Sequence, residues 1–369
     1  MAAVTSSALK DAVIAAARRQ DFLNTGVCSA ARTPHADFLD TWLARGWHGT
    51  MDWLERTPDW RKDISTRYPW ARSYLAISID YPSQPTPNGI ARYAFGPDYH
   101  EVYKPRLKQL EDDIIGIGGP GTRALWYQDT GPFLERAIAH QAGLGWVGKN
   151  TMLISPERGS WTLLALVLTS LELPPDPPGT DHCGNCTRCL DACPTQAFPA
   201  PYQLNASRCV SYLTIEHAGA VSQELRAEIG NWLYGCDICN EVCPWNSKAP
   251  EMTRETPNIG GLTVAKILTS KPEHLRKRIA GTPLARTGVA KLRVNAAIVA
   301  GNQKDERTLP SLEQALQTED EELQEAVVWA LRQFNTPKAR SLLARAQKYV
   351  TNEELRESII QTLQQQPPA

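Results

Sequence analysis

Eight of the nine cysteines in this 369-residue chain lie between positions 183 and 243, in two runs that end alike. The first run is Cys183-x2-Cys186-x2-Cys189-x3-Cys193 followed by proline, and the second is Cys209, then Cys236-x2-Cys239-x3-Cys243 followed by proline. Bacterial ferredoxins use the first spacing: three thiolates hold one 4Fe-4S cluster and the fourth reaches a second cluster. The pattern therefore predicts two 4Fe-4S clusters with interleaved ligands.

This interleaving assigns four cysteines to each cluster. Cluster one takes Cys183, Cys186, Cys189 and Cys243, and cluster two takes Cys193, Cys209, Cys236 and Cys239. Two zinc sites or a disulfide framework are the alternatives. The third cysteine at x2 spacing and the Cys-Pro ending of both runs favour clusters over zinc.

Upstream of the cysteines, one aspartate and one glycine-rich segment could act on a ligand. Asp129 follows an expected strand and precedes an expected helix, so it could cap that helix or take part in catalysis. The segment 143–150 holds three glycines, which allow backbone to approach a bulky ligand, and ends in the polar pair Lys149 and Asn150. An ordinary helix-to-strand turn is the alternative for this segment.

The elements that must position these residues fall into three expected domains. Residues 1–175 alternate helix patterns (7–19, 37–45, 99–115, 132–141) with strand patterns (73–81, 123–128 and a pair within 151–168), which predicts an α/β domain. After a proline-rich linker, residues 176–250 form a ferredoxin-like two-cluster domain. Residues 251–369 are expected to be helical, and similar segments at 292–302 and 323–331 indicate HEAT-like repeats. The fold class is thus multidomain α+β.

Composition and charge narrow the class further. The formal net charge is -1, and no apolar run is long enough for a membrane span, so we expect no membrane association. Free thiolates and oxygen-sensitive clusters suit a reducing cytoplasm. The isolated Cys28 is expected to be a small buried apolar residue. The stretch 271–293 is basic, with Glu273 as its single acid, and is either a docking surface for RNA phosphates or a solvated helix face.

Several ordered motifs together resemble the epoxyqueuosine reductases, cobalamin-dependent iron–sulfur enzymes of tRNA modification. Besides both cysteine runs, they are Arg92-Tyr93-Ala94-x-Gly96-x-Asp98-Tyr99-His100, Asp129-Thr130-Gly131-Pro132, the segment 143–150, Gly159-Ser160-Trp161, the segment 211–217 and Tyr234-Gly235-Cys236-Asp237. The segment 211–217 falls within the insertion that splits the second cysteine run. Gln128 departs from the family, which often has valine or tyrosine there.

The resemblance implies an enzyme that reduces epoxyqueuosine at the tRNA wobble position to queuosine. Electrons would pass through two 4Fe-4S clusters to cobalamin, with Asp129 as the proton donor. It implies that residues 1–175 bind cobalamin, near Tyr99, His100, Asp129, Lys149, Asn150, Leu153, Ser160, Ser211, Cys236 and Asp237. We expect the tRNA anticodon stem-loop to bind the helical domain through Arg276, Lys277, Arg278, Arg286, Lys291 and Arg293.

The expected partners are tRNA and an external low-potential electron donor of flavodoxin or ferredoxin type, and the chain is expected to be a monomer. A cobalamin and iron–sulfur reductase of small molecules, similar to reductive dehalogenases, is the alternative function. A plain ferredoxin-type electron carrier is a third, but it would leave the long segment before the cysteines without a purpose.

Overall fold

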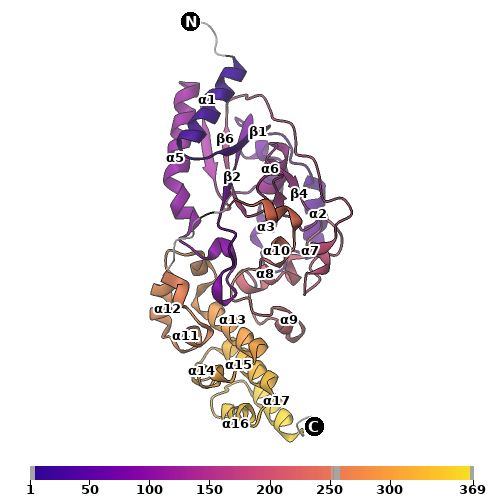
Figure 1. Cartoon of the computed structure of the whole chain (residues 1–369), viewed down its shortest axis with the longest axis vertical. Helices are drawn as coiled ribbons and strands as arrows, with labels where there is room; N and C mark the ends of the chain where they lie inside the picture. The colour runs from indigo at the N-terminus through magenta and orange to yellow at the C-terminus, as the bar shows by residue number, and fades with distance from the viewer. Residues whose placement is uncertain (1–4, 251, 253–257, 366–369) are drawn as a thin grey trace. The chain divides into compact units, whose positions relative to one another are not determined.

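The computed structural model describes residues 5–250, 252 and 258–365 (Figure 1). Internal contacts divide the chain into two units, and both are discontinuous. The first unit comprises Met1–Gln84, Tyr99–Ser207 and Asp237–Arg254, and the second comprises Pro85–Asp98, Arg208–Cys236 and Glu255–Ala369. The insertion that splits the second cysteine run therefore belongs to the second unit.

A four-stranded antiparallel sheet forms the centre of the first unit. Its order is β1 (Asn24–Ser29), β2 (Ser73–Asp80), β6 (Thr162–Thr169) and β3 (Ala124–Tyr127). Because side chains alternate along a strand, β2 presents Leu75 and Ile77 to one face and Tyr74 and Ala76 to the other. Both sets are buried, so the sheet is covered on both faces.

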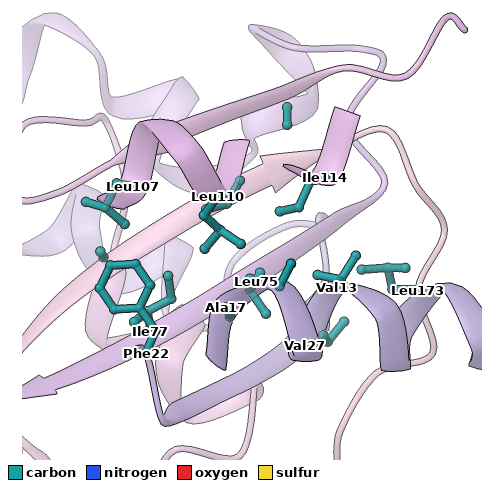
Figure 2. Packing of buried hydrophobic residues seen from close by; sticks show 14 residues of the cluster. Val13, Ala17, Phe22, Val27, Leu75, Ile77, Leu107, Leu110, Ile114 and Leu173 are labelled. Atoms are coloured by element: carbon teal, nitrogen blue, oxygen red, sulfur yellow. The ribbon is translucent and has the colours of Figure 1, made fainter. Parts of the chain in front are cut away.

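Two long helices cover one face of this sheet. They are α1 (Ser6–Arg19) and α5 (Tyr99–Gly118). Figure 2 shows Val13 of α1 and Leu107, Leu110 and Ile114 of α5 pointing toward Leu75 of β2 and its neighbours. The apolar residues of each helix recur at helical spacing, so this packing is the burial of one amphipathic stripe per helix. The N-terminus of α5 is thereby fixed against the sheet.

Shorter elements cover the other face and carry the cysteine loops. Helix α6 (Glu135–Gln141) packs Ile138 and Ala139 against the strands, and a small hairpin of β4 (Trp146–Val147) and β5 (Leu153–Ile154) follows it. The remaining helices of this unit are α2 (Ala36–Ala44), α3 (Trp53–Arg56), α4 (Pro58–Lys62), α7 (Arg188–Asp191) and α10 (Ile238–Glu241). Helices α7 and α10 lie within the two cysteine runs.

The second unit is helical. In chain order its helices are α8 (Val210–Ile215), α9 (Gln223–Glu228), α11 (Val264–Thr269), α12 (Pro272–Ile279), α13 (Gly288–Gln303), α14 (Leu309–Ala315), α15 (Glu321–Phe334), α16 (Pro337–Ala346) and α17 (Glu353–Gln364). Helices α13 and α15 cross closely at Gly301, where an added Cβ would lie 2.7 Å from the Trp329 ring and 2.8 Å from the Ala330 Cα. Only glycine fits this crossing.

The insertion 208–236 is held by two asparagine side chains of α13, the buried Asn295 and the partly buried Asn302. Asn295 Nδ2 donates to the carbonyls of Thr214 and Leu233, at 2.8 and 3.0 Å. Asn302 Nδ2 donates to the carbonyls of Arg226 and Gly230, each at 2.9 Å. These bonds satisfy carbonyls that the short helices α8 and α9 leave without partners, so the insertion is an integral part of the second unit.

Several expected elements are confirmed, and four need correction. The helices near 7–19 and 37–45 and the strands near 73–81 and 123–128 form as expected. Strand β1 was not expected, because its sequence Asn-Thr-Gly-Val-Cys-Ser does not alternate. The expected pair within 151–168 is wrong, since β5 pairs with β4 while β6 pairs with β2 and β3. The predicted helix 132–141 begins only at Glu135, and the predicted helix 99–115 continues to Gly118.

Two further sequence expectations have clear outcomes. Cys28 is buried in the core, where burial raises the pKa of its thiol to about 12, so it serves as an apolar residue. In the part of the chain that the structure describes, no helix is long and apolar enough to cross a membrane.

Candidate active site

Asp129 lies in a tight loop between β3 and α6, not at a helix cap. The N-cap residue of α6 is Leu134, and Pro132 precedes the helix. Asp129 has a φ of 56°, in the left-handed region that aspartate tolerates better than most non-glycine residues. The cap hypothesis is therefore wrong, and the exposed carboxyl of Asp129 is available for another role.

Two hydrogen bonds fix Asp129 from both ends. The hydroxyl of Tyr99, the first residue of α5, donates to Asp129 Oδ2 at 2.7 Å. The backbone N–H of Asp129 donates to Glu135 Oε1 at 3.0 Å. The Tyr99 ring stacks on His100, with ring centroids 4.1 Å apart. The structure thus brings together three of the residues predicted near the corrin: Tyr99, His100 and Asp129.

Glu135 was not selected from the sequence. Its pKa is nevertheless strongly shifted, and it lies beside Asp129. Its pKa is raised from 4.5 to about 8, first by burial and then by the nearby charge of Asp129. The hydrogen bond from the Asp129 backbone and the charges of Arg136 and Arg61 oppose this rise. Glu135 accepts a hydrogen bond from the Asp129 backbone, and residue types alone do not reveal a bond of this kind. The only feature of the sequence that points to Glu135 is that a helix begins directly after the loop.

Gln128 is buried beside Asp129 with its side-chain amide unsatisfied. Among the described residues, neither Oε1 nor Nε2 of Gln128 has a hydrogen-bond partner. A buried amide without partners is costly, so this group is left for water or for a polar group of a bound molecule. The departure from the family at position 128 therefore places polar atoms next to Asp129.

Four thiols line one cavity in the first unit. The cavity has a volume of about 100 Å³, and Cys183, Cys186, Cys189 and Cys243 all contribute to its wall. The space is large enough for a group of several atoms. The predicted ligand set of cluster one is thus brought together, and the residues present fit a 4Fe-4S cluster.

The thiols of this cavity also perturb one another. The pKa of Cys189 is raised to about 11, first by burial and then by the charge of Cys183. The pKa of Cys243 is also raised, chiefly by burial, with a contribution from Cys183. Coordination to iron replaces the thiol protons and removes this mutual repulsion. All nine cysteines are free thiols, which excludes the disulfide framework.

Aromatic rings enclose the same cavity. Trp146 is fully buried, and its indole Nε1 donates to Cys183 Sγ at 3.3 Å. Its ring meets those of Trp245 and His182 edge-on, each at a centroid distance of 5.0 Å. Trp245 and His182 also line the cavity. These rings exclude water from one side of the predicted cluster.

The ligands predicted for cluster two are divided between the units. Cys193 and Cys239 belong to the first unit, and Cys209 and Cys236 belong to the second. Cys193 Sγ accepts the backbone N–H of Ala197 at 3.3 Å, so this sulfur is already oriented. The assignment of these four residues to one cluster stays a prediction.

Two of the residues predicted to contact the corrin instead support the cysteine loops. Lys149 Nζ donates to the carbonyls of Gly184 and Cys186, at 2.6 and 3.0 Å. Asn150 is buried, and its Nδ2 lies 3.4 Å from the Cys239 carbonyl, to which it donates. The contacts tie the segment 143–150 to both cysteine runs.

The other residues predicted near the corrin are mostly buried. Ser160 Oγ donates to Asn240 Oδ1 at 2.9 Å, which joins the start of β6 to α10. Leu153 is in the core, and Asp237 is buried at the start of α10. Ser211 and Cys236 belong to the second unit, so the structure does not group them with Asp129.

Three of the six residues predicted to bind tRNA have internal partners. Arg286 pairs with Glu216. Lys291 donates to the Gly219 carbonyl at 3.2 Å and lies 3.5 Å from Glu322, and Arg293 donates to the Leu268 carbonyl at 3.1 Å. The remaining three, Arg276, Lys277 and Arg278, are exposed on α12.

Comparisons with known proteins agree with this arrangement. The family model "Epoxyqueuosine reductase QueG, DUF1730" matches residues 61–130, "4Fe-4S double cluster binding domain" matches 182–246, and "HEAT repeats" matches 283–364. An epoxyqueuosine reductase of Xanthomonas campestris is 37% identical over 86% of this chain and 94% of its own length. One of Pseudomonas aeruginosa is 37% identical over 85% of this chain and 91% of its own.

Solved structures match at nearly full length. A selenomethionine-labelled epoxyqueuosine reductase has a TM-score of 0.87 at 30% identity, covering 96% of this chain and 98% of the other. A second epoxyqueuosine reductase, solved with an epoxyqueuosine-modified stem loop of tyrosine tRNA, has a TM-score of 0.85 at 30% identity and the same coverage. The two-cluster and HEAT-like parts of the expected fold are confirmed. The chain belongs to the epoxyqueuosine reductase family of oxidoreductases.

Proposed function

We propose that this protein reduces the epoxide of epoxyqueuosine in tRNA to the alkene of queuosine, with Asp129 as the proton donor. The family supports the reaction, and a relative was solved with an epoxyqueuosine-modified tRNA stem loop. The observation that carries the role of Asp129 is its exposed carboxyl, held by the Tyr99 hydroxyl at 2.7 Å. Family membership favours this activity over small-molecule dehalogenation and over simple electron carriage.

The reaction defines what the site must supply. Two C–O bonds of the epoxide break, one C=C bond forms, and the oxygen leaves as water. Two electrons and two protons are therefore consumed. Two 4Fe-4S clusters would pass single electrons inward from an external low-potential donor of flavodoxin or ferredoxin type. Cobalamin, when bound, would supply a strongly reducing cobalt centre, and Tyr99, His100 and Asp129 would lie beside it.

The protein's own contribution is to deliver a proton to the departing oxygen. A carboxyl can act as a general acid only if it is held within reach of the atom that it protonates. The bonds to Tyr99 and Glu135 restrict Asp129 at its side chain and at its backbone. Tyr99 and His100 would help to hold the cofactor beside Asp129.

The regions of the chain would divide this work. Residues 1–175 would bind cobalamin, residues 176–250 the clusters, and residues 251–369 the tRNA. Arg276, Lys277 and Arg278 on α12 would grip the phosphate backbone, and the wobble base would enter the site. We place this monomeric enzyme in the cytoplasm, where tRNA and reducing equivalents are available.

The test is a single anaerobic assay. The reconstituted protein, with cobalamin, a low-potential reductant and tRNA containing epoxyqueuosine, should yield queuosine, measured by mass spectrometry of digested nucleosides. Asp129→Asn should lose at least about a hundredfold in turnover, because an amide cannot donate an acidic proton. Asparagine also tolerates a positive φ, so the loop should persist.

Iron content and the cobalamin spectrum of the variant serve as controls. Queuosine formation by Asp129→Asn at a near-normal rate would remove Asp129 from the mechanism. Failure of the fully loaded wild-type protein to form queuosine would refute the reaction itself.

A further inference from the structure

The loop that carries Asp129 closes on itself through one carboxyl group. Glu135 is half-buried at the start of α6, and its Oε1 accepts the backbone N–H of Asp129 at 3.0 Å. The bond links the second residue of the loop 128–134 to Glu135, the first residue of α6. It leaves the Asp129 side chain free to bond with Tyr99.

The backbone at Asp129 needs such a support. A left-handed φ is unfavourable for a non-glycine residue and persists where surrounding contacts hold it. The bond from the Asp129 N–H to Glu135 is one such contact. Loss of this acceptor would allow the residue to relax toward the extended or helical region.

The far half of the loop is anchored separately. The Phe133 ring is buried and meets Tyr127 and Tyr74 at centroid distances of 4.8 and 5.8 Å. Its carbonyl accepts a bond from Arg61 Nη1 at 3.4 Å. An added Cβ at Gly131 would lie 2.4 Å from the Phe133 ring, so the chain there is tightly folded. The Asp129 end has no comparable apolar anchor, because Asp129 and Thr130 are both exposed.

We propose that Glu135 is a positioning residue for Asp129. Its carboxyl oxygen holds the backbone of Asp129 in the left-handed conformation that directs the Asp129 side chain to Tyr99. This inference rests on the proposed role of Asp129 and extends it by naming the group that holds the acid in place. The charged groups around Glu135 are Asp129, Arg61 and Arg136.

Three substitutions separate acceptor, charge and size. Glu135→Gln keeps an oxygen at the same reach but cannot ionise. Glu135→Asp keeps the charge but shortens the side chain by one methylene, so its oxygen should no longer reach the N–H. Glu135→Met keeps the approximate size without an acceptor. If the hydrogen-bond acceptor is the important feature, the loop of Glu135→Gln should behave like that of the wild type. The loops of Glu135→Asp and Glu135→Met should then behave like each other.

Hydrogen exchange of the loop amides is the primary measurement, because it does not depend on catalysis. A hydrogen bond commonly contributes enough for up to about tenfold protection. The Asp129 amide should therefore exchange about tenfold faster in Glu135→Asp and Glu135→Met, and at the wild-type rate in Glu135→Gln. In the assay, kcat for epoxide reduction should fall about tenfold in Glu135→Asp and Glu135→Met, with KM for tRNA unchanged. Glu135→Gln should keep the wild-type kcat.

Two results would overturn the inference. One is unchanged exchange in Glu135→Asp and Glu135→Met. The other is a loss in Glu135→Gln as large as in Glu135→Met, since this would make the ionisable proton, not the acceptor, the important feature. If Asp129→Asn proves active, the role of Asp129 fails, but the exchange measurement still decides whether Glu135 holds the loop.

Discussion

The indole nitrogen of Trp146 lies 3.3 Å from the Sγ of Cys183 and donates a hydrogen bond to it. Hydrogen bonds to cluster sulfurs stabilise the reduced, more negative state and so help to set the reduction potential. Trp146 is buried, which makes the bond inaccessible to competing water. The sequence places this tryptophan in the glycine-rich segment 143–150, but the pattern does not reveal its bond to Cys183.

Trp146→Phe should therefore lower the reduction potential of one cluster and leave the other unchanged. The phenyl ring retains the packing against Trp245 and His182 but has no N–H to donate. Potentiometric titration followed by electron paramagnetic resonance measures both clusters at once, so the second cluster is an internal reference. Trp126→Phe, a half-buried position in the other core layer, is the matched control. Equal potentials in variant and wild type would contradict the prediction.

Tyr99→Phe should reduce kcat while leaving binding of tRNA intact. The variant loses only the hydroxyl that donates to Asp129 Oδ2, and the stacking on His100 is kept. A hydrogen bond between neutral groups contributes about 1 kcal/mol, so the expected loss is about fivefold. Steady-state kinetics on epoxyqueuosine-containing tRNA gives kcat and KM separately. A rise in KM alone would show that Tyr99 contacts the substrate and does not support the acid.

Glu135 also predicts a pH dependence of stability. Its pKa is raised from 4.5 in the unfolded chain to about 8 in the folded protein, mainly by burial. Its contribution to stability is therefore complete below pH 4.5 and is lost as the pH rises to about 8, by up to about 1.4 kcal/mol per unit. The glutamine of Glu135→Gln does not titrate. The difference in Tm between this variant and the wild type, measured by calorimetry, should thus move in favour of the variant from about pH 6 to about pH 8.

If the difference in Tm between Glu135→Gln and the wild type did not change with pH, the raised pKa of Glu135 would be contradicted. Wild type and variant share the other titrating groups, so these contributions cancel in the comparison. Asp129→Asn provides a second check, because it removes the neighbouring negative charge that raises the pKa of Glu135. In that background the effect of Glu135→Gln should be smaller.

Much of this architecture follows from local sequence patterns, and the rest depends on contacts between distant segments. The apolar periodicity of α5 and the β-branched and leucine-rich composition of β6 identify those elements directly. Strand β1 is different: Gly26 is required because an added Cβ would lie 1.9 Å from the Ala142 carbonyl oxygen, a contact between segments far apart in sequence. Composition alone cannot show such a contact.

In the candidate active site, too, local patterns identify some residues, and contacts within the fold decide the roles of others. The cysteine spacing identified all four thiols of the observed cavity, because cluster geometry dictates it. Asp129 was ambiguous between cap and acid, since capping depends on where the helix begins, and burial of Phe133 delays that start to Glu135. Lys149 was expected to face the corrin, but two carbonyls of the first cysteine loop bind its ammonium group.

Replacing Arg276, Lys277 and Arg278 together by alanine should weaken tRNA binding. These three residues are exposed on α12, whereas Arg286, Lys291 and Arg293 have internal partners. Each phosphate that is no longer neutralised should reduce the slope of log affinity against log salt by about 0.7 to 0.9. Filter binding or fluorescence anisotropy over a range of salt concentrations measures this slope.

The triple alanine variant of Lys304, Lys338 and Lys348 is the control, since it removes the same charge from exposed positions elsewhere on the helical unit. Turnover on a minimal anticodon stem-loop at saturating concentration should survive in both variants. If affinity and salt slope are the same in the two triple variants, α12 is only a solvated helix face.

The fourth thiol of the first cavity has a consequence for biosynthesis. Cys243 joins Cys183, Cys186 and Cys189 in the cavity wall, but the ribosome makes it only after the residues 208–236 that belong to the second unit. A nascent chain thus carries three thiols of this site before their partner exists. Iron insertion into the complete site must wait until translation has passed Cys243, and during that interval the emerging thiols are open to oxidation and to capture of other metals.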